Sequence, residues 1–552
     1  MRLINIHLGL LLGLTASVAI AQDSRAGGTV DSLFSPFNEN IRPGLAVAVV
    51  RDGRLVFANG YGMANLEHRV RITPATVFDV ASVSKQFAGL AIAMLVEQGK
   101  IRLSDDVRRY IPELGDVGYT ITIDHLVHHT SGLRDWPGSL SLAGWRMDDV
   151  IAFDQILRFA YHQRSLNFKP GDEYTYSNTG YNLLAEVVAR VTGRSFRQFT
   201  QEQLFRPLGM TRSRFHDDVT ELIPDRAFGY AKSDSGWKSI TDNLAALGSS
   251  SLFTTVEDLA KWVANFDDPK VGGAAAMTRT RTRGQLNDGS TIPYAFGVSH
   301  GEYRGQPTVA HSGSWAEFAT YVLHFPREHA GVIVLANSGS INASSAAYQV
   351  ADAFLGSAFG ARAEDTLATA PAITAPAAML DRYAGLYRLG PGWYLRIRHE
   401  GNALTTQATR EPAFPMSARS DTSFWVDGYR AMMAFTNVKV GPITLIYRNR
   451  PYPRLIERGS APPSDLSAYG GEYESEELGT KYRIEVKDAG LVMQHYRHGT
   501  IPLTWLWKED FGGSAWFTRS VEFERDASGR VIGFSVFVDE RSRHIRFSKL
   551  LR

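Results

Sequence analysis

The chain has 552 residues, which at about 150 residues per domain predicts three or four structural units. Hydrophobic residues make up 44% and charged residues 21%, and the formal net charge is +2; this composition excludes a largely disordered chain and gives no general attraction to nucleic acid or to an anionic membrane. Because the sequence has no cysteine, it excludes disulfides, thiolate metal sites and a cysteine nucleophile.

Residues 1–21 are typical of a secretory signal peptide. Arg2 gives a positively charged start, an apolar run extends from Leu8 to Ile20, and Ala19-Ile20-Ala21 offers a cleavage site of the small-x-small kind. The apolar run is short for a membrane span, so an uncleaved anchor is the weaker alternative. We therefore expect a bacterial protein that is periplasmic or secreted, with no integral membrane segment in the mature chain.

Residues 28–360 show the mixture of strands and helices expected of one α+β domain. Two apolar runs flank Asp52-Gly53, which predicts a β-hairpin over residues 46–57. From Ser82 to about Ile101 apolar residues repeat every three or four positions, which predicts a helix. Further helices are expected at 181–191, 256–266 and 344–355, and further strands at 318–325 and 331–336. Strands at both ends predict a sheet assembled from both ends of the domain.

The sequence changes character after a linker at residues 361–377, which is rich in Ala, Thr and Pro. The motif Leu380-x-x-Tyr383-x-Gly385-x-Tyr387 recurs as Leu466-x-x-Tyr469-x-Gly471-x-Tyr473, and short alternating segments follow each copy. This predicts two related small antiparallel β-barrel domains, 378–460 and 465–552, with one larger β-domain as the alternative.

Aromatic residues of this tail are expected to fill barrel cores; they include Tyr394, Trp505, Trp507 and Trp516. None of the tail's polar residues forms a recognisable catalytic arrangement. Because few contacts need to cross a Pro/Ala-rich linker, we expect residues 22–362 to fold without the tail.

Ser82 and Lys85 place a hydroxyl and an amine on one face of a helix, in its first turn. A lysine can serve as the base that a serine nucleophile needs, and a helix start offers backbone N–H groups to a developing oxyanion. The motif alone is weak, because Ser235 and Lys238 repeat it in a polar loop. Only the first pair opens a long apolar helix, although an ordinary N-cap serine remains the alternative there.

Two further short motifs carry residue types that suit hydrolysis. Tyr176 and Asn178 follow a turn and precede a helix; a Tyr near a cation can act as a base, and an Asn can bond a substrate amide. His311 and Gly313 directly precede a strand, where a glycine allows a ligand to approach the backbone. Each motif has chance matches elsewhere in the chain, so only their combination is informative.

In order and spacing, these motifs resemble the three signature motifs of the penicillin-binding protein and serine β-lactamase superfamily. The likeness is to the class C β-lactamase-related branch, which includes esterases, DD-peptidases and D-aminopeptidases. It covers about residues 30–360 and includes the blocks FDVASVSK, LVHHTSGL and LGSSSLFTTVEDL. The resemblance implies an antiparallel sheet with a helical subdomain. A catalytic domain followed by two β-barrels also resembles three-domain D-aminopeptidases.

The resemblance implies a serine hydrolase that cleaves an amide or ester through an acyl-enzyme on Ser82. Lys85 and Tyr176 would share the proton transfer, and which of them is the base stays open. The backbone N–H groups of Ser82 and Ser314 would bind the oxyanion, and Asn178 and His311 would orient a small-molecule or short peptide or ester substrate.

The third motif departs from the common Lys-Thr-Gly, because His311 stands where a permanently charged lysine would bind a substrate carboxylate. This weakens the case for a β-lactamase or DD-carboxypeptidase and favours a D-aminopeptidase or esterase. The hypothesis from another class is a catalytically silent penicillin-recognising sensor. Intact Ser82, Lys85 and Tyr176 argue against that reading.

Other chemistry lacks support in the sequence. The run Asp124-His125-x-x-His128-His129 contains metal-binding residue types, but the family block places His129 in a structural turn and no His-Glu-x-x-His is present. No phosphate-binding glycine motif and no Gly-x-Ser-x-Gly elbow occurs. We therefore predict no metal, no cofactor and no nucleic-acid partner, and the sequence sets no oligomeric state.

Overall fold

The computed structural model describes residues 24–38, 41–361, 371–373, 377–437, 442–448, 450–455 and 462–550. The chain divides into two compact units, one formed by Met1–Trp136 with Met147–Ala361 and the other by Pro137–Arg146 with Arg362–Arg552. The expected signal peptide, 1–21, and most of the expected linker, 361–377, lie outside the described residues. Within the described ranges, no helix is both long enough and apolar enough to cross a membrane.

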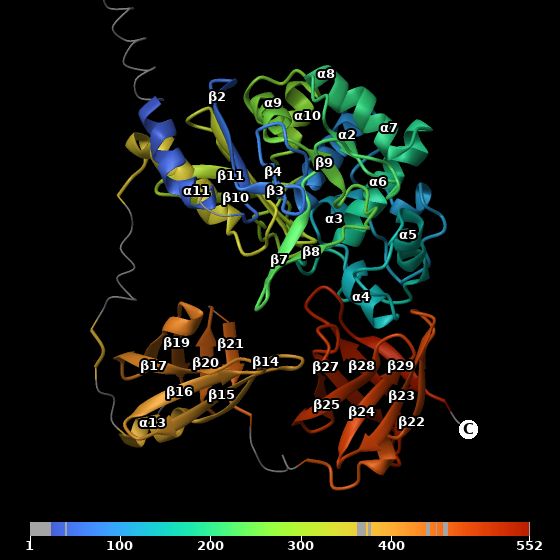
Figure 1. Cartoon of the computed structure of the whole chain (residues 1–552). Coiled ribbons are helices and arrows are strands. Elements are labelled where there is room, and N and C mark those ends of the chain that lie inside the picture. Colours follow the sequence, from blue (N-terminus) through green and yellow to red (C-terminus); the bar gives the residue numbers. More distant parts are fainter. Residues whose placement is uncertain are drawn as a thin grey trace, which may run out of the picture. The chain divides into compact units, whose positions relative to one another are not determined.

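A six-stranded antiparallel sheet forms the centre of the first unit, with strand order β10-β11-β12-β13-β1-β2 (Figure 1). The strands are β1 (Leu45–Arg51), β2 (Arg54–Tyr61), β10 (Ser299–Tyr303), β11 (Gln306–Trp315), β12 (Phe318–Phe325) and β13 (Ala330–Ala336). Leu45 of β1 pairs with Ala336 of β13, and Arg51 pairs with Ala330. The prediction that the sheet is assembled from both ends of the domain is therefore confirmed.

Both faces of this sheet are covered, because successive side chains of β1 point to opposite sides. Leu45, Val47 and Val49 pack with the helix at residues 24–34 and with α11 (Ala343–Leu355). Ala46, Ala48 and Val50 belong to the larger core on the other face, which also contains α2 (Lys85–Glu97) and α9 (Val256–Asp267). A strand buried on both faces reads as a continuous apolar run, as the sequence of β1 does.

The helical part of this unit lies between β2 and β10 in the sequence. Its helices are α2 (Lys85–Glu97), α3 (Ile123–Val127), α5 (Phe153–His162), α6 (Asn178–Thr192), α7 (Phe196–Thr200), α8 (Arg206–Leu208), α9 (Val256–Asp267) and α10 (Gly273–Arg279). The helix predicted from Ser82 to Ile101 is shorter than expected. It begins as the 3-10 helix η2 (Ala81–Ser84) and ends before Gly99, whose φ of 68° breaks the helix.

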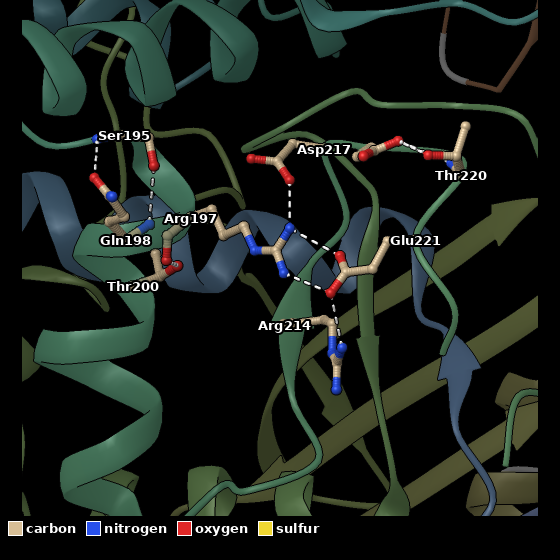
Figure 2. A network of polar contacts seen from close by, with 9 residues as sticks. Ser195, Arg197, Gln198, Thr200, Arg214, Asp217, Thr220 and Glu221 are labelled. Carbon is tan, nitrogen blue, oxygen red and sulfur yellow. Dashed lines mark hydrogen bonds and ion pairs between the residues drawn. The ribbon is translucent and has the colours of Figure 1, made fainter. Parts of the chain in front are cut away.

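A small sheet has the strand order β5-β9-β6, and β5 directly precedes η2 in the chain. Its strands are β5 (Phe78–Asp79), β9 (Leu252–Thr254) and β6 (Arg214–Phe215). Beside it, an ion-pair network ties α7 to the segment after β6 (Figure 2). The guanidinium of Arg197 lies 2.7 Å from Asp217 and 2.8 Å from Glu221, and Arg214 lies 3.0 Å from Glu221. The network fixes the outer strand of the small sheet against the helical part.

The second unit contains two eight-stranded antiparallel structures, each built in chain order. The first comprises α13 (Ala377–Tyr383), β14 (Gly385–Gly390), β15 (Trp393–Glu400), β16 (Ala403–Ala408), β17 (Ala413–Ser420), β18 (Ser423–Val426), β19 (Ala431–Thr436), β20 (Thr444–Tyr447) and β21 (Arg450–Pro453). An isolated bridge from Tyr387 to Arg454 joins its two end strands. The second is a closed barrel of β22 (Gly471–Ser475), β23 (Thr480–Lys487), β24 (Gly490–His495), β25 (Gly499–Trp507), β26 (Asp510–Gly513), β27 (Ser520–Arg525), β28 (Val531–Phe537) and β29 (Ile545–Lys549). The predicted fold class is confirmed.

The sequence repeat has the same structural meaning in both copies. The hydroxyl of Tyr387 donates to the carbonyl of Tyr383 at 2.7 Å, and that of Tyr473 donates to Tyr469 at 2.6 Å. The repeat's glycine has a φ of 151° in the first copy and 144° in the second, a backbone conformation that favours glycine. All four tyrosines are fully buried. The repeat therefore encodes a buried corner at the start of each barrel.

Residues 137–146, which we expected within the catalytic domain, belong instead to the unit of the barrels. Leu142 is fully buried in the core of the closed barrel, and its carbonyl accepts a hydrogen bond from the Tyr482 hydroxyl at 3.0 Å. His498 Nε2 lies 2.7 Å from the Ser141 carbonyl. The closed barrel thus includes, in its core, a segment that is distant in the sequence.

The aromatic residues expected in the barrel cores have different environments. Trp505 packs at the edge of the closed-barrel core. Trp507 and Tyr394 lie outside both barrel cores, in a separate small cluster with Leu386, so the expectation was wrong for these two. Trp516 is 52% exposed, so the expectation was wrong for that residue.

Candidate active site

Ser82 lies at a strained turn between β5 and α2. The preceding Ala81 has a φ of 46°, which is unfavourable for a residue with a Cβ atom. A hydrogen bond of 2.7 Å from the Ala81 N–H to Asp79 Oδ1 stabilises this conformation. Ser82 itself is half-buried within η2, so its hydroxyl is held by backbone geometry at the first turn of a buried helix.

The side chain of Lys85 is fully buried, and its amine lies within hydrogen-bonding distance of oxygens from several segments. Its Nζ lies 3.1 Å from Ser82 Oγ, 2.8 Å from Asn178 Oδ1 and 2.8 Å from the carbonyl oxygen of Ser249. A buried charge needs such compensation, so this arrangement holds a cation against the Ser82 hydroxyl.

Tyr176 and Asn178 lie on the other side of this cation. Lys85 Nζ is 4.7 Å from the ring centroid of Tyr176, within the range of a cation–π contact. Asn178 begins α6, and its Nδ2 donates to Asp135 Oδ2 at 2.8 Å while its backbone N–H donates to Asp135 Oδ1 at 2.7 Å. These bonds fix the amide so that its oxygen faces Lys85. Asn178 therefore orients the lysine, a role beyond the substrate contact expected from the sequence.

His311 is buried in β11 as a neutral ring. Its Nδ1 lies 2.6 Å from the carbonyl of Ser312 and must donate, so Nε2 is the acceptor for the Tyr294 hydroxyl at 2.8 Å. Burial, with the nearby charge of Lys85, lowers the pKa of His311 from 6.5 to about 3. The third motif thus supplies a neutral polar group where the common motif supplies a positive charge.

Gly313 lets β11 approach the nucleophile turn. A Cβ atom at this position would lie 2.2 Å from the carbonyl oxygen of Val80 and 2.3 Å from Thr320 Oγ1. Thr320 also donates to that carbonyl at 3.0 Å. The next residue, Ser314, is exposed on the same strand. Close packing of β11 against the nucleophile turn therefore requires this glycine.

The histidines of the 124–129 run have separate partners. His125 is part of the capping box of α3, and His128 lies 3.1 Å from Asp124. His129 Nδ1 accepts the N–H of Ser177, and burial lowers its pKa well below the usual range. In the described part of the chain, no three metal-ligating side chains gather in one place.

The second Ser-x-x-Lys pair, Ser235 and Lys238, is exposed, unlike the buried Lys85 beside Ser82. Ser235 lies in the exposed turn between β7 (Gly229–Ser233) and β8 (Gly236–Ile240), and Lys238 is exposed on β8. The structure therefore brings together Ser82, Lys85 and Asn178, with Tyr176 beside them, and it leaves the other pair on the surface.

Sequence reasoning missed three residues that organise this site. Asp135 holds Asn178, the Ser249 carbonyl accepts from Lys85, and Tyr294 donates to His311. The block that contains Ser249 resembles the family, but a backbone carbonyl has no signature in a sequence. Asp135 and Tyr294 act across long stretches of chain, and only the fold shows that they meet their partners.

The family model described as Beta-lactamase matches residues 30–356. The chain is 30% identical over 346 residues to a D-aminopeptidase of Gluconobacter oxydans (strain 621H), covering 62% of this chain and 64% of that protein. It is 29% identical over 311 residues to Protein flp of Staphylococcus aureus (strain MRSA252), covering 54% and 60%.

The match spans less than two thirds of either relative. Among solved structures, the octameric penicillin-binding protein homologue from Pyrococcus abyssi aligns with a TM-score of 0.56 at 24% identity, covering 77% of this chain and 99% of that one. This likeness concerns the fold. Because the family model covers more than half of the chain, the protein belongs to the Beta-lactamase family.

Proposed function

We propose that the protein is an exported serine hydrolase that cleaves an amide or ester through an acyl-enzyme on Ser82, with a D-aminopeptidase-like or esterase-like specificity. The observation that carries the proposal is the fully buried Lys85, whose Nζ lies 3.1 Å from Ser82 Oγ and is held by Asn178 and Ser249. A buried lysine amine within hydrogen-bonding distance of a serine hydroxyl suits the activation of that hydroxyl as a nucleophile.

In this proposal Ser82 Oγ attacks the substrate carbonyl carbon and its proton passes to the Lys85–Tyr176 pair. Which of the two takes the proton first stays open, because an interacting pair titrates as a unit. The backbone N–H groups of Ser82 and Ser314 would bind the oxyanion. The leaving amine or alcohol then takes the proton, and water hydrolyses the ester on Ser82 by the reverse sequence of transfers.

The neutral ring of His311 favours a substrate that places no carboxylate at this position. A ring with a pKa of about 3 is neutral at physiological pH, so it can offer hydrogen bonds but no fixed charge. Most β-lactam and DD-peptide recognition would gain from such a charge. The 30% identity to a D-aminopeptidase points in the same direction.

The test is a substrate profile of the chain from residue 22, offered D-aminoacyl amides, short acyl esters and nitrocefin. We expect amide or ester hydrolysis to exceed nitrocefin hydrolysis. Ser82→Ala should lower turnover by on the order of 10³-fold or more, while the matched Ser235→Ala should leave it unchanged. Faster hydrolysis of nitrocefin than of every other substrate would favour a β-lactamase. No turnover of any substrate, with binding of penicillin retained, would favour a silent sensor.

A further inference from the structure

A pair of buried carboxyl groups lies beside the nucleophile turn and has no part in the chemistry proposed above. Asp79 ends β5 and is fully buried, and Asp242, just after β8, is 8% exposed. The two carboxyl groups are neighbours: burial and the charge of Asp242 raise the pKa of Asp79, and burial also raises the pKa of Asp242. Two carboxylates that meet in a buried site cannot both be ionised without a large penalty, so the pair retains a proton.

The surroundings indicate which carboxyl group carries that proton. Arg226 Nη2 lies 3.5 Å from Asp242 Oδ2 and donates to the Asp242 backbone carbonyl, which favours an ionised Asp242. Asp79 Oδ1 already accepts the Ala81 N–H, and in the described part of the chain no hydrogen-bond donor reaches Asp79 Oδ2 or either carboxyl oxygen of Asp242. The oxygen Oδ2 of Asp79 is therefore the atom placed to carry the proton and donate it to Asp242.

The other groups near the pair agree with one negative charge. The cation of Arg226 is stacked 4.6 Å from the ring centroid of Phe253 on β9. His216 follows β6; burial and the charge of Arg226 lower its pKa, so it is neutral at pH 7. Burial, followed by the charge of Asp242, raises the pKa of Asp79 well above its usual range. One cation, Arg226, thus faces one carboxylate and one neutral acid.

The two carboxyl groups stand at the start of the two segments that build the site. Asp79 binds the N–H of Ala81, directly before the nucleophile, and Asp242 precedes the loop that supplies the Ser249 carbonyl to Lys85. We propose that Asp79 is a positioning residue: as a neutral acid it accepts from Ala81 and donates to Asp242, and so fixes the Ser82 turn to the 242–249 loop. The proposal rests on the proposed function in taking Ser82 as the nucleophile.

Variants of the full chain from residue 22 test the positioning role. Asp79→Asn keeps both an acceptor for Ala81 and a donor for Asp242, so kcat is expected to stay within about threefold. Asp79→Ala removes both bonds and is expected to lower kcat by about 10- to 100-fold with little change in KM, as for a misplaced catalytic group. The matched control is Asp234→Ala, an exposed aspartate on the β7–β8 turn, which should have no effect. Equal loss in Asp79→Asn and Asp79→Ala would overturn the proposal.

Infrared spectroscopy tests the proton itself, in a Ser82→Ala background that needs no turnover. We expect the difference spectrum against Ser82→Ala/Asp79→Asn at pH 7 to contain the C=O stretching band of a protonated carboxyl group. In the Asp242→Asn variant, this band should disappear at a lower pH than in the parent protein. The reason is that the negative charge of Asp242, which raises the pKa of Asp79, is lost. Absence of the band at pH 7, with Ser82 of the wild type still reactive, would overturn the pairing alone. A band with an unreactive Ser82 would instead count against the proposed function.

Discussion

His311 enters the folded state without a proton, and this makes the stability of the protein depend on pH. Its folded-state pKa of about 3 lies below the ordinary value of 6.5. Below pH 6.5, His311 therefore binds a proton in the unfolded chain but stays neutral in the folded chain. The stability that His311 contributes is fully present above pH 6.5 and is lost progressively as the pH falls toward 3.

The first prediction compares wild type with His311→Gln, which cannot titrate. Between pH 7 and pH 5, wild type should lose about 2 kcal/mol more of its free energy of unfolding than the variant. Urea unfolding at the two pH values measures this difference. The contributions of all other titratable groups, such as His129, are the same in both proteins and cancel in the comparison. An equal loss in both proteins would show that His311 is not held neutral by the fold.

At the scale of elements, the contact between β11 and the nucleophile turn depends on a single missing side chain. Gly313→Ala would place a Cβ atom 2.2 Å from the Val80 carbonyl, so strand and turn must separate. We expect a loss of about 1–3 kcal/mol of stability and of about 10- to 100-fold in kcat/KM. Thermal melting and ester hydrolysis measure the two effects.

The matched control for this substitution is Gly28→Ala, in the helix at residues 24–34. A Cβ atom there meets no atom within 4 Å, and alanine is favoured over glycine in a helix. This variant should keep full activity and melt at the same or a slightly higher temperature. Full activity in Gly313→Ala would show that the approach of β11 does not define the site.

Local pattern predicted many of these elements from the sequence. The hairpin at 46–57, the strands at 318–325 and 331–336 and the helix at 256–266 all lie within a few residues of their observed bounds, because each has a clear period and a turn signal. The spacing of Ser82 and Lys85 likewise predicted their contact. The acceptors of Lys85 and the partner of Asn178 could not be predicted, since they depend on backbone carbonyls and on contacts between distant segments.

At the scale of the whole molecule, the closed barrel is not an independent C-terminal domain, because residues 137–146 are part of its unit. Nothing in their composition marks them as part of a barrel, and the expectation that residues 22–362 fold alone did not allow for them. Truncation at 362 would leave Leu142 without the core that buries it. We expect such a truncated chain to be less soluble and less stable than the full one.

A cleavage experiment tests this association in the full chain. A protease site inserted at residues 456–461 separates the closed barrel covalently from everything before it. We expect the 462–552 fragment to co-elute with the remainder on gel filtration, because residues 137–146 stay in its core. Separation of the fragments at micromolar concentration would contradict this assignment.

Leu142→Ala should weaken the same association, since removing a buried leucine costs about 2–5 kcal/mol. After cleavage, this variant should release the 462–552 fragment more readily than wild type. Leu222→Ala is the matched control, because Leu222 is 87% exposed and its loss should change nothing. Identical release by both variants would mean that Leu142 does not hold the barrel.

The central claim, that Ser82 forms the acyl-enzyme, is tested most directly by the mass of the protein during turnover. Wild type mixed with an activated D-aminoacyl ester and quenched in acid should carry one acyl group, and peptide mapping should place it on Ser82. Ser82→Ala should carry none, and Ser235→Ala should be labelled like wild type. An acyl group on any other residue, or rapid turnover in Ser82→Ala, would contradict the account.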